Sequence, residues 1–584
     1  MKIDNLTNGE RLELFSSLFE ESRRAHGELA EELSRNMEQY RGSLKIDGSH
    51  EDAATVRNIT YEIIESQVSS DIPAPKVEPS FYNERRSECA IAIEKLLSSV
   101  RDRLPFESMN DMDERYTYIY GGSVWFVEWD NTVRLGRETG SVKVRLISPT
   151  DFFPQPNVYD IRDMEYCFLR FTTTKDELVR RYGVKEEELS LARCEYSGGG
   201  EIKEYDTVEV VLAFFKNELG EVGQLLFSGE LTLSYDPSYY KRKRTVCSRC
   251  KREIRECDCK SPSPTLTDIT VEHIEKEEIT DPERFPVRLE SGGISLPYYL
   301  PKDFPIVIRK NVSSEDSLLG QSDCKYVRPE QQAINKIESR ILKKLLLAGV
   351  TPIMPEDASV SLNNSVFGQV IRMKPGESAD QYGTVDTTPS LDADMKEADR
   401  LYEHSKRILG ISDAYLGMSE NKNESGIAKQ MMIAQATGRL ESKRRMKNTA
   451  YAELDRLIFE HYLAFADDPR MLYHKDAYGR VHETVFDRRD FIELDPLTGL
   501  YYYDDSYLFS IDLNGGSEYQ REALWQRNLE NLEAGTLGDK SDPKTLLRYW
   551  QCQQRAHYPH ARENVEYFSA LAGEEYETTI IRKD

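Results

Sequence analysis

The longest helical pattern in the sequence covers about residues 425–464, and it constrains the possible folds more than any other feature. A helix of about forty residues far exceeds the ordinary helix of a globular protein, which has roughly 10–14 residues. Two shorter helices are predicted before it, at residues 328–348 and 391–409, because apolar residues recur there at intervals of three and four. A glycine follows each of these two helices, Gly349 and Gly410, and ends it.

The segments between these helices differ in character. Residues 351–390 contain prolines and glycines, which predict short strands and turns. Residues 411–424 form a polar loop that leads into the long helix. The middle of the long helix carries a basic cluster, although the chain as a whole is acidic. The cluster consists of Arg439, Lys443, Arg444, Arg445 and Lys447.

Composition restricts the class of protein. The 584 residues are enough for three or four compact units, and with 39% hydrophobic and 31% charged residues they can form cores and a polar surface. The net charge of -25 argues against tight nonspecific DNA binding, which needs clustered cations. No apolar run approaches the ~18 residues of a membrane span, and the first residues lack a signal-peptide pattern. We therefore expect synthesis in the cytosol and no membrane association.

The rest of the chain predicts an α+β fold. Before residue 123 the spacing is helical, and after it alternation with a period of two predicts strands. A short helix at residues 175–182 should be capped by Thr174 and Glu177. The predicted helices are residues 11–40, 57–69, 84–102, 112–120 and those within 517–571. The predicted strands are residues 124–130, 141–148, 165–173, 207–218 and 224–235, with others within 470–494 and 500–514.

The order of these elements, together with short sequence motifs within them, resembles that of the portal proteins of tailed bacteriophages. No single motif is diagnostic, and the match depends on the order and spacing of the motifs over roughly residues 57–571. The matching residues are Tyr298–Pro305, Gly320–Asp323, Pro329, Gln331, Gln332, Asn335, Gly410, Leu416–Gly417, Ser425–Gly426 and Ala428.

The resemblance implies a division of the chain into the parts of a portal subunit. Two stem helices flank a small α/β clip, and the long helix lies beside a central channel. The implied parts are N-terminal helices and an α/β wing at 1–297, a wing-to-stem segment with the first stem helix at 298–350, the clip at 351–390, the second stem helix at 391–410, the channel loop and long helix at 411–464, wing-completing strands at 465–516, and a short helical crown with the C-terminal tail at 517–584.

The same resemblance implies a function. It predicts a ring of identical subunits, a dodecamer, at one vertex of the virion capsid, assembled in the host cytoplasm and serving as a conduit for packaging and ejection of double-stranded DNA. Its partners would be the terminase large subunit, the major capsid protein and scaffold, and head-completion or adaptor proteins. A ring requires heterologous contacts that close by rotation.

Two sets of residues are candidates for the subunit contacts and the DNA contacts of such a ring. In the stem, we expect Lys343 and Lys344 to pair with Glu397 or Asp399 of an adjacent subunit. In the channel, we expect Lys422 and the basic cluster of the long helix to make weak contacts with DNA phosphates. The alternative for the cluster is pairing with Glu441, Glu453 or carboxylates of a neighbouring subunit.

Four cysteines form a separate feature that is not part of the resemblance. Cys247-x-x-Cys250 and Cys257-x-Cys259 lie in an insert at about residues 241–264. Two closely spaced pairs of thiolates can complete a tetrahedral zinc site, and metal binding would order a segment without an apolar core. The alternatives are a solvated loop of reduced thiols or a redox pair. The other five cysteines are scattered, so no disulfide framework is expected.

No catalytic motif is present. The sequence lacks a P-loop, an HExxH helix, a GxSxG elbow and a dinucleotide-binding glycine fingerprint, and we therefore expect no enzymatic activity. The second functional hypothesis is a zinc-containing nucleic-acid-binding protein that acts through the four-cysteine insert.

Overall fold

The structure is a computed structural model of residues 1–584. It contains both helices and strands, and the protein belongs to the α+β class. The residues described are 3, 6–43, 56–81, 83–136, 138–194, 207–249, 259, 264–274, 293–315, 317–347, 350–353, 363–365, 368–370, 383–386, 390–411, 426–475, 481–511, 518–555, 558 and 561–572.

The chain divides into two compact units. The first contains Met1–Glu31, Val68–Gln321 and Ser442–Asp584, and the second contains Glu32–Gln67 and Ser322–Glu441. Two helices cross the boundary between the units, α2 (Gly27–Arg41) and α9 (Gly426–Phe465). Each unit is described by itself below.

In the first unit, a five-stranded antiparallel sheet has the order β4-β5-β6-β7-β8. The helix α1 (Asn8–Ala25) packs Phe15 and Phe19 against Phe168 of this sheet. Alternate residues of β6 lie in two different apolar clusters, so the strand is buried from Val208 to Phe215. The strands are β4 (Phe152–Pro154), β5 (Tyr166–Thr174), β6 (Thr207–Lys216), β7 (Val222–Ser228) and β8 (Leu231–Asp236).

A second core of the first unit surrounds the C-terminal half of α9. Leu454, Ile458 and Phe459 of this helix are fully buried. Trp125 of the three-stranded sheet β13-β2-β3 packs edge-on against Tyr451 with ring centroids 5.7 Å apart. The elements of this core are α4 (Glu84–Arg103), α5 (Phe106–Tyr120), β2 (Gly122–Leu135), β3 (Glu138–Ile147) and β13 (Ile306–Lys310).

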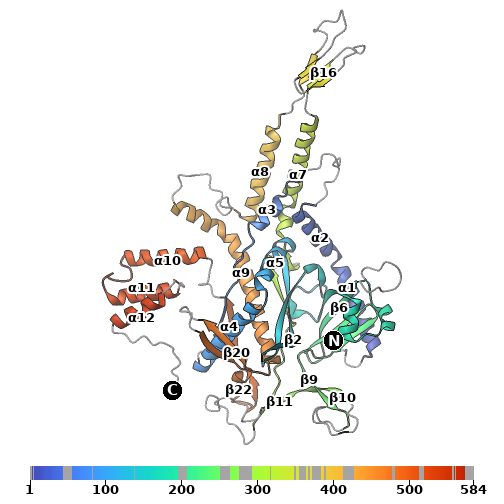
Figure 1. Ribbon diagram of the computed structural model, residues 1–584, viewed down its shortest axis with the longest axis vertical. Helices are drawn as coiled ribbons and strands as arrows, with labels where there is room; N and C mark the ends of the chain where they lie inside the picture. Colours follow the sequence, from blue (N-terminus) through green and yellow to red (C-terminus); the bar gives the residue numbers. More distant parts are fainter. Residues whose placement is uncertain are drawn as a thin grey trace, which may run out of the picture. The chain divides into compact units, whose positions relative to one another are not determined.

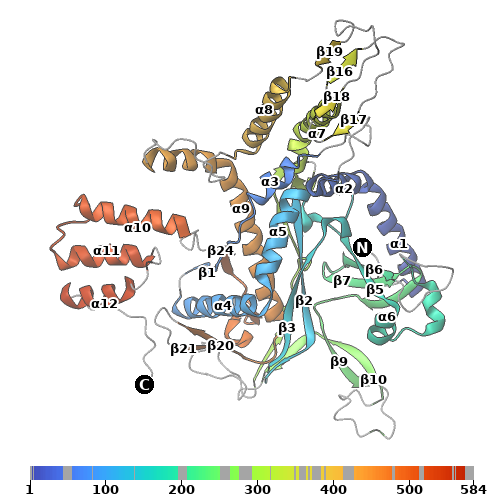
Figure 2. The same ribbon diagram turned by 45° about the horizontal axis from the view of Figure 1, so that its top comes forward.

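Short antiparallel pairs complete the first unit. The strand β1 (Pro75–Pro79) pairs with β24 (Tyr507–Ile511), so that Val77 lies opposite Phe509. The helices α10, α11 and α12 lie side by side (Figures 1 and 2). The remaining elements are α6 (Lys175–Tyr182), β9 (Arg242–Cys247) with β10 (Pro264–Ile269), β11 (Val271–Ile274) with β12 (Ile294–Pro297), β14 (Val312–Ser314) with β15 (Ser317–Gln321), β20 (Arg470–Lys475) with β21 (Val481–Phe486), β22 (Ile492–Leu494) with β23 (Tyr501–Tyr503), α10 (Glu518–Glu533), α11 (Pro543–Arg555) and α12 (Ala561–Ala572).

The second unit is built on the helix pair α7 (Asp323–Leu347) and α8 (Asp392–Leu409), which lie side by side in Figure 1. Gly410 adopts φ 77° and ends α8, as predicted. The short helix α3 (Ile59–Glu65) packs Ile59 and Ile63 against α7 and α8. Between α7 and α8 the described strands form two pairs, β16 (Val350–Ile353) with β19 (Gly383–Asp386) and β17 (Asn363–Ser365) with β18 (Gly368–Val370).

Several predicted boundaries were wrong. The single helix predicted at residues 11–40 is two helices, because α1 ends at Ala25 and α2 begins at Gly27. The helix predicted at 57–69 covers only Ile59–Glu65, and the one predicted at 112–120 begins already at Phe106. The strand predicted at 224–235 is a hairpin of β7 and β8, because Gly229 adopts φ 56° and turns the chain.

The predicted cap of α6 was also wrong in detail. Thr174 occupies the cap position, but its hydroxyl makes no capping hydrogen bond. The hydroxyl of Thr173 instead donates to Glu177 at 2.9 Å. The helix α7 begins at Asp323, earlier than predicted, and it contains Pro329. Pro329 is the seventh residue of α7 and has no N–H, so the helix lacks the backbone hydrogen bond from residue 329 to the carbonyl of Lys325.

Candidate subunit-contact, channel and metal-binding residues

The helix pair α7–α8 is held together by one buried stripe on each helix. On α8, the buried residues Asp394, Ala398, Ser405 and Leu409 recur at helical intervals. Near the base of the pair, Leu409 belongs to the same apolar cluster as Ile334 of α7, which is fully buried. This packing follows from the apolar periodicity, because only residues three or four apart share one face of a helix.

A buried carboxylate joins the two helices farther along. Asp394 of α8 accepts hydrogen bonds from both Arg340 and Lys344, which lie one turn apart on α7. The hydrogen bond from Lys344 and the charge of Arg340 lower the pKa of Asp394. Asp394 therefore stays ionised and fixes the register of α7 against α8.

The predicted stem residues already have contacts inside the chain. Lys344 pairs with Asp394, which the sequence analysis did not name. Asp399 lies 3.6 Å from Arg57, and Glu397 lies 2.5 Å from Arg400. These contacts are exposed, with the carboxylate of Asp399 70% accessible, so a neighbouring subunit can compete for them at little cost.

The outer surface of the pair is apolar in places and divided in charge. Leu345 of α7 and Met395 of α8 are each more than half exposed, at 51% and 54%. Lys343 is exposed, and no ion pair joins it to another of the described residues. The charges of α7 beyond Ile334 are mostly positive: Lys336, Arg340, Lys343 and Lys344 against Glu338. Those of the first half of α8 are mostly negative: Asp392, Asp394, Glu397 and Asp399 against Lys396 and Arg400.

Two members of the basic cluster on α9 are buried in the first unit. Lys447 is 5% exposed, and its ammonium lies 3.0 Å from Glu114 and donates to the carbonyl of Asp71 at 2.6 Å. Lys443 is 7% exposed and lies over the ring of Tyr118 at 5.0 Å. These two lysines anchor α9 to α5, and we correct the expectation that they face DNA.

A buried arginine completes the anchor of α9. Arg309 of β13 lies between two neighbouring carboxylates of α5, Asp113 and Glu114, with 2.8 Å to Glu114. Burial alone would raise the pKa of Glu114, but the charges of Arg309 and Lys447 outweigh it and lower the pKa. Burial also lowers the pKa of Lys447. Arg309, Lys447, Asp113 and Glu114 thus form a buried charge cluster in which two positive charges compensate two negative charges.

The other channel candidates divide into two groups. Arg445 is exposed and Arg444 is partly exposed. Arg439 lies on α9, but its side chain is outside the described part of the structure, as is Lys422. Nothing in the sequence distinguished the buried from the exposed members, because the residues that the buried lysines contact, Glu114 and Tyr118, are far away in the chain.

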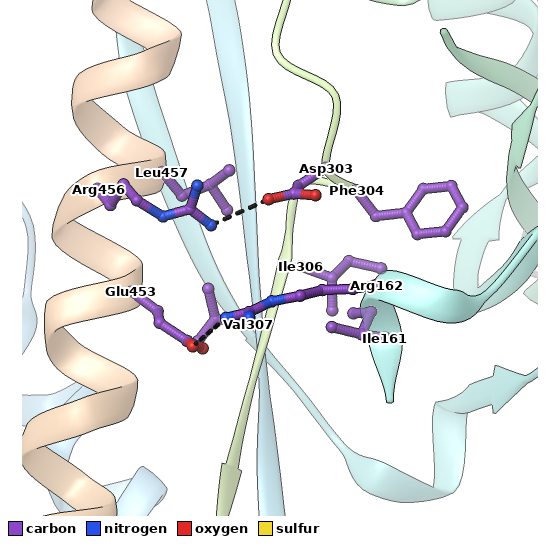
Figure 3. Close-up of a pocket in the computed structure, with 9 residues that line it drawn as sticks. All are labelled: Ile161, Arg162, Asp303, Phe304, Ile306, Val307, Glu453, Arg456 and Leu457. Atoms are coloured by element: carbon purple, nitrogen blue, oxygen red, sulfur yellow. Dashed lines mark hydrogen bonds and ion pairs between the residues drawn. The ribbon is translucent and has the colours of Figure 1, made fainter. Parts of the chain in front are cut away.

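A small pocket lies beside α9 in the first unit (Figure 3). Two ion pairs border it, Arg456 with Asp303 at 3.0 Å and Arg162 with Glu453 at 3.1 Å. Its volume of about 30 Å³ holds one or two water molecules, so it has no room for a substrate. The other lining residues are Ile161, Phe304, Ile306, Val307 and Leu457.

The four-cysteine insert begins with the strand β9, which pairs with β10. Cys247 is the last residue of β9, is fully buried and lies opposite Pro264. Cys259 is half-buried, whereas Cys250 and Cys257 lie outside the described residues. Among the described residues, no three His, Cys, Asp or Glu side chains form a metal-binding group, but only two of the four cysteines are among them.

Comparison with known proteins gives no match to a family and no match to a curated protein. Within the described part of the chain, no helix has the length and apolar character needed to cross a membrane.

Proposed function

We propose that this protein is the portal subunit of a tailed bacteriophage. It would form a ring at one capsid vertex through which double-stranded DNA is packaged and ejected. The observation that carries the proposal is the order of the elements: α7, short strand pairs, α8 and then the forty-residue helix α9. The short sequence motifs of the resemblance lie near the ends of these elements.

The surface of the α7–α8 pair supports the ring. A single chain leaves Leu345 and Met395 in water, and it carries an excess of cations on α7 beyond Ile334 and an excess of anions on the first half of α8. Such a surface is complementary to itself when copies are arranged head to tail, with α7 of one subunit against α8 of the next. Contacts of this heterologous kind close into a ring when the rotation between copies divides a full turn.

The exposed arginines of α9 support the conduit. In a ring, Arg444 and Arg445 would offer weak contacts to DNA phosphates, whereas the overall charge of -25 opposes tight binding. The terminase, the scaffold and capsid protein, and the head-completion proteins are the partners that a portal requires. The alternative is a nucleic-acid-binding protein that acts through the insert. It has less support, because Arg242 and Lys243 at the base of the hairpin already pair with Asp467 and Asp236.

A charge-reversal experiment tests the proposed subunit contact. Lys343→Glu should reduce the fraction of rings seen by electron microscopy, because it places like charges across the contact. Asp399→Lys in the same chain should restore them. Arg180→Glu on α6, an exposed position with an equal change of charge, is the control. Normal ring assembly by Lys343→Glu contradicts the contact.

A deletion separates the two functions. Removal of residues 241–264 should leave ring assembly largely intact if the chain is a portal. The same deletion should abolish nucleic-acid binding, measured by a gel shift with double-stranded DNA, if the insert carries the function.

A further inference from the structure

We propose that Glu460 of α9 is a proton-controlled latch for residues 298–305, the irregular segment that joins β12 to β13. When the carboxyl group is protonated, the segment is held against α9. When the group is ionised, the hold on the segment is weakened. The inference goes beyond the proposed portal function and does not depend on it, because all of its contacts lie inside the first unit.

One guanidinium serves two carboxylates at this place. Glu460 is 6% exposed, and one of its oxygens accepts a hydrogen bond from Arg456 at 2.8 Å. The same Arg456 donates to Asp303 of the segment at 3.0 Å (Figure 3). The ion pair that ties the segment to α9 is therefore shared with a buried carboxyl group of the helix itself.

A third carboxylate lies near this pair. Asp505, in the turn between β23 and β24, accepts a hydrogen bond from the hydroxyl of Tyr299 at 2.9 Å, and its charge acts on Glu460. With Glu460 ionised, three carboxylates surround the one arginine, and the group has a net charge of -2. Two of these carboxylates contact the segment or belong to it, so their repulsion by Glu460 pushes the segment away from α9.

The environment of Glu460 places its ionisation near neutral pH. Burial raises the pKa of Glu460, and the charges of Asp303 and Asp505 act in the same direction. Together they outweigh Arg456 and bring the pKa to about 7. The proton on Glu460 therefore relieves the excess of negative charge below pH 7, and its loss restores that excess above pH 7.

Other titratable side chains beside the cluster keep their charge over this range. Burial raises the pKa of Tyr299 and of Tyr240, whose hydroxyl donates to the carbonyl of Asp303 at 3.3 Å, so both phenols stay neutral. Burial lowers the pKa of the adjacent His461 to about 4, so its imidazole is also neutral. On the far side of the pocket in Figure 3, Glu453 of α9 pairs with Arg162.

The direction of the effect follows from the raised pKa. The closed segment favours the protonated form of Glu460, whereas an open segment exposes the group to water and returns its pKa to the usual 4.5. The open state is therefore disfavoured at low pH and gains population as the pH rises through 7. If opening exposes Glu460 fully, this population increases about tenfold between pH 6 and pH 8. The water-sized pocket lined by Arg456 and Asp303 adjoins the pair that must separate.

Hydrogen exchange of the full-length protein tests the proposal. Exchange is followed by mass spectrometry at pH 6, 7 and 8, with labelling times corrected for the intrinsic pH dependence of exchange. In peptides covering residues 298–306, the wild type should lose about tenfold in protection from pH 6 to pH 8. Glu460→Gln, which keeps the shape and cannot ionise, should show constant protection. Glu13→Gln, at an exposed position of α1, is the control and should follow the wild type.

Two outcomes of this experiment would overturn the latch. One is the same pH course in the wild type and in Glu460→Gln, including a wild type whose protection does not change. The other is an equal loss of protection in peptides from β6, because that result would show global unfolding of the unit instead of local opening.

Asp505→Asn keeps the test decisive if Glu460→Gln does not fold. This exposed substitution leaves the buried carboxyl group in place, and the amide oxygen can still accept from Tyr299. It removes a charge that raises the pKa of Glu460. The loss of protection between pH 6 and pH 8 should therefore be smaller than in the wild type, and a loss of the same size would contradict the charge coupling.

Discussion

The buried charge cluster that anchors α9 predicts a specific loss of stability for Lys447→Met. The ammonium of Lys447 lies 3.0 Å from Glu114 and donates to the carbonyl of Asp71 at 2.6 Å, and the side chain is 5% exposed. Methionine keeps most of the volume and removes the charge. The substitution therefore isolates the electrostatic contribution from the packing contribution.

The size of the stability loss depends on which contacts of Glu114 and Asp71 remain after the substitution. Removing one partner of a buried ion pair costs about 3–5 kcal/mol when the other charge is left alone. Here Glu114 keeps Arg309 at 2.8 Å, so its charge stays compensated. The lost hydrogen bond from a charged donor to Asp71 is worth about 1.5–3 kcal/mol. We expect the free energy of unfolding to fall by about 1.5–3 kcal/mol.

Urea unfolding followed by tryptophan fluorescence measures this loss. Trp125 is a built-in reporter, because its indole N–H donates to Asp113 in the same cluster at 3.0 Å. The control is Arg445→Met, an exposed position two residues away, which should change the stability by less than about 0.5 kcal/mol. A Lys447→Met protein as stable as the control would refute the view that this lysine is an internal anchor.

Three further predictions concern other parts of the chain. Asp394→Asn should accelerate hydrogen exchange in α7 and α8, measured by mass spectrometry, because Arg340 and Lys344 lose their shared carboxylate. Glu397→Gln, a change at a more exposed position, should exchange like the wild type. Equal exchange in both variants would contradict a role of Asp394 in holding the two helices together. Burial lowers the pKa of His461 to about 4, so between pH 4 and 6.5 the unfolded chain binds a proton here that the folded chain does not, and the stability falls as the pH falls through this range. Relative to His461→Phe, the wild type should lose about 3 kcal/mol between pH 6.5 and 4 in urea titrations, and a constant difference between the two proteins would exclude this titration. Gly320 has φ 91°, and an added Cβ would lie 2.6 Å from the carbonyl oxygen of Val312. Gly320→Ala should therefore lower the Tm by several degrees. Gly9→Ala, where nothing lies within 4 Å of the added Cβ, should leave the Tm unchanged, and equal Tm values for the two variants would refute the steric argument.

Local patterns in the sequence predicted the long elements well. The lengths of α8 and α9 follow from apolar periodicity, and the end of α8 follows from Gly410 in the left-handed conformation. The mixed α+β class follows from the change of period near residue 123. These properties depend on residues that are close in the chain, so that a single window of sequence contains the information.

Pairings between distant segments could not be predicted. The strand pair β1–β24 joins Val77 to Phe509, and nothing in either segment specifies the other. The fate of Lys447 is a similar case, because its carboxylate partner, Glu114, comes from α5. An exposed and a buried lysine look alike in a sequence, and only the tertiary structure determines which of them is desolvated.

The partner of the stem lysines shows the same limit within a single unit. The sequence suggested Glu397 and Asp399 of an adjacent subunit for Lys344, and it did not indicate the contact of Lys344 with Asp394 that the structure has within the chain. All three carboxylates lie on α8 within two turns, and the rotation of the helix about its axis determines which of them faces α7. That rotation is set by the buried stripe of Ala398 and Leu409, which the periodicity does indicate.

The measurement that tests the central proposal most directly is negative-stain electron microscopy of the purified full-length protein, with mass photometry of the same sample over a range of protein concentrations and with a co-expressed scaffold. The account predicts rings with a central hole and a mass close to twelve times the 67.4 kDa of one chain. Particles of only one or two chains under all of these conditions would contradict it. A monomer that binds double-stranded DNA tightly at moderate salt would instead favour the nucleic-acid-binding function of the insert.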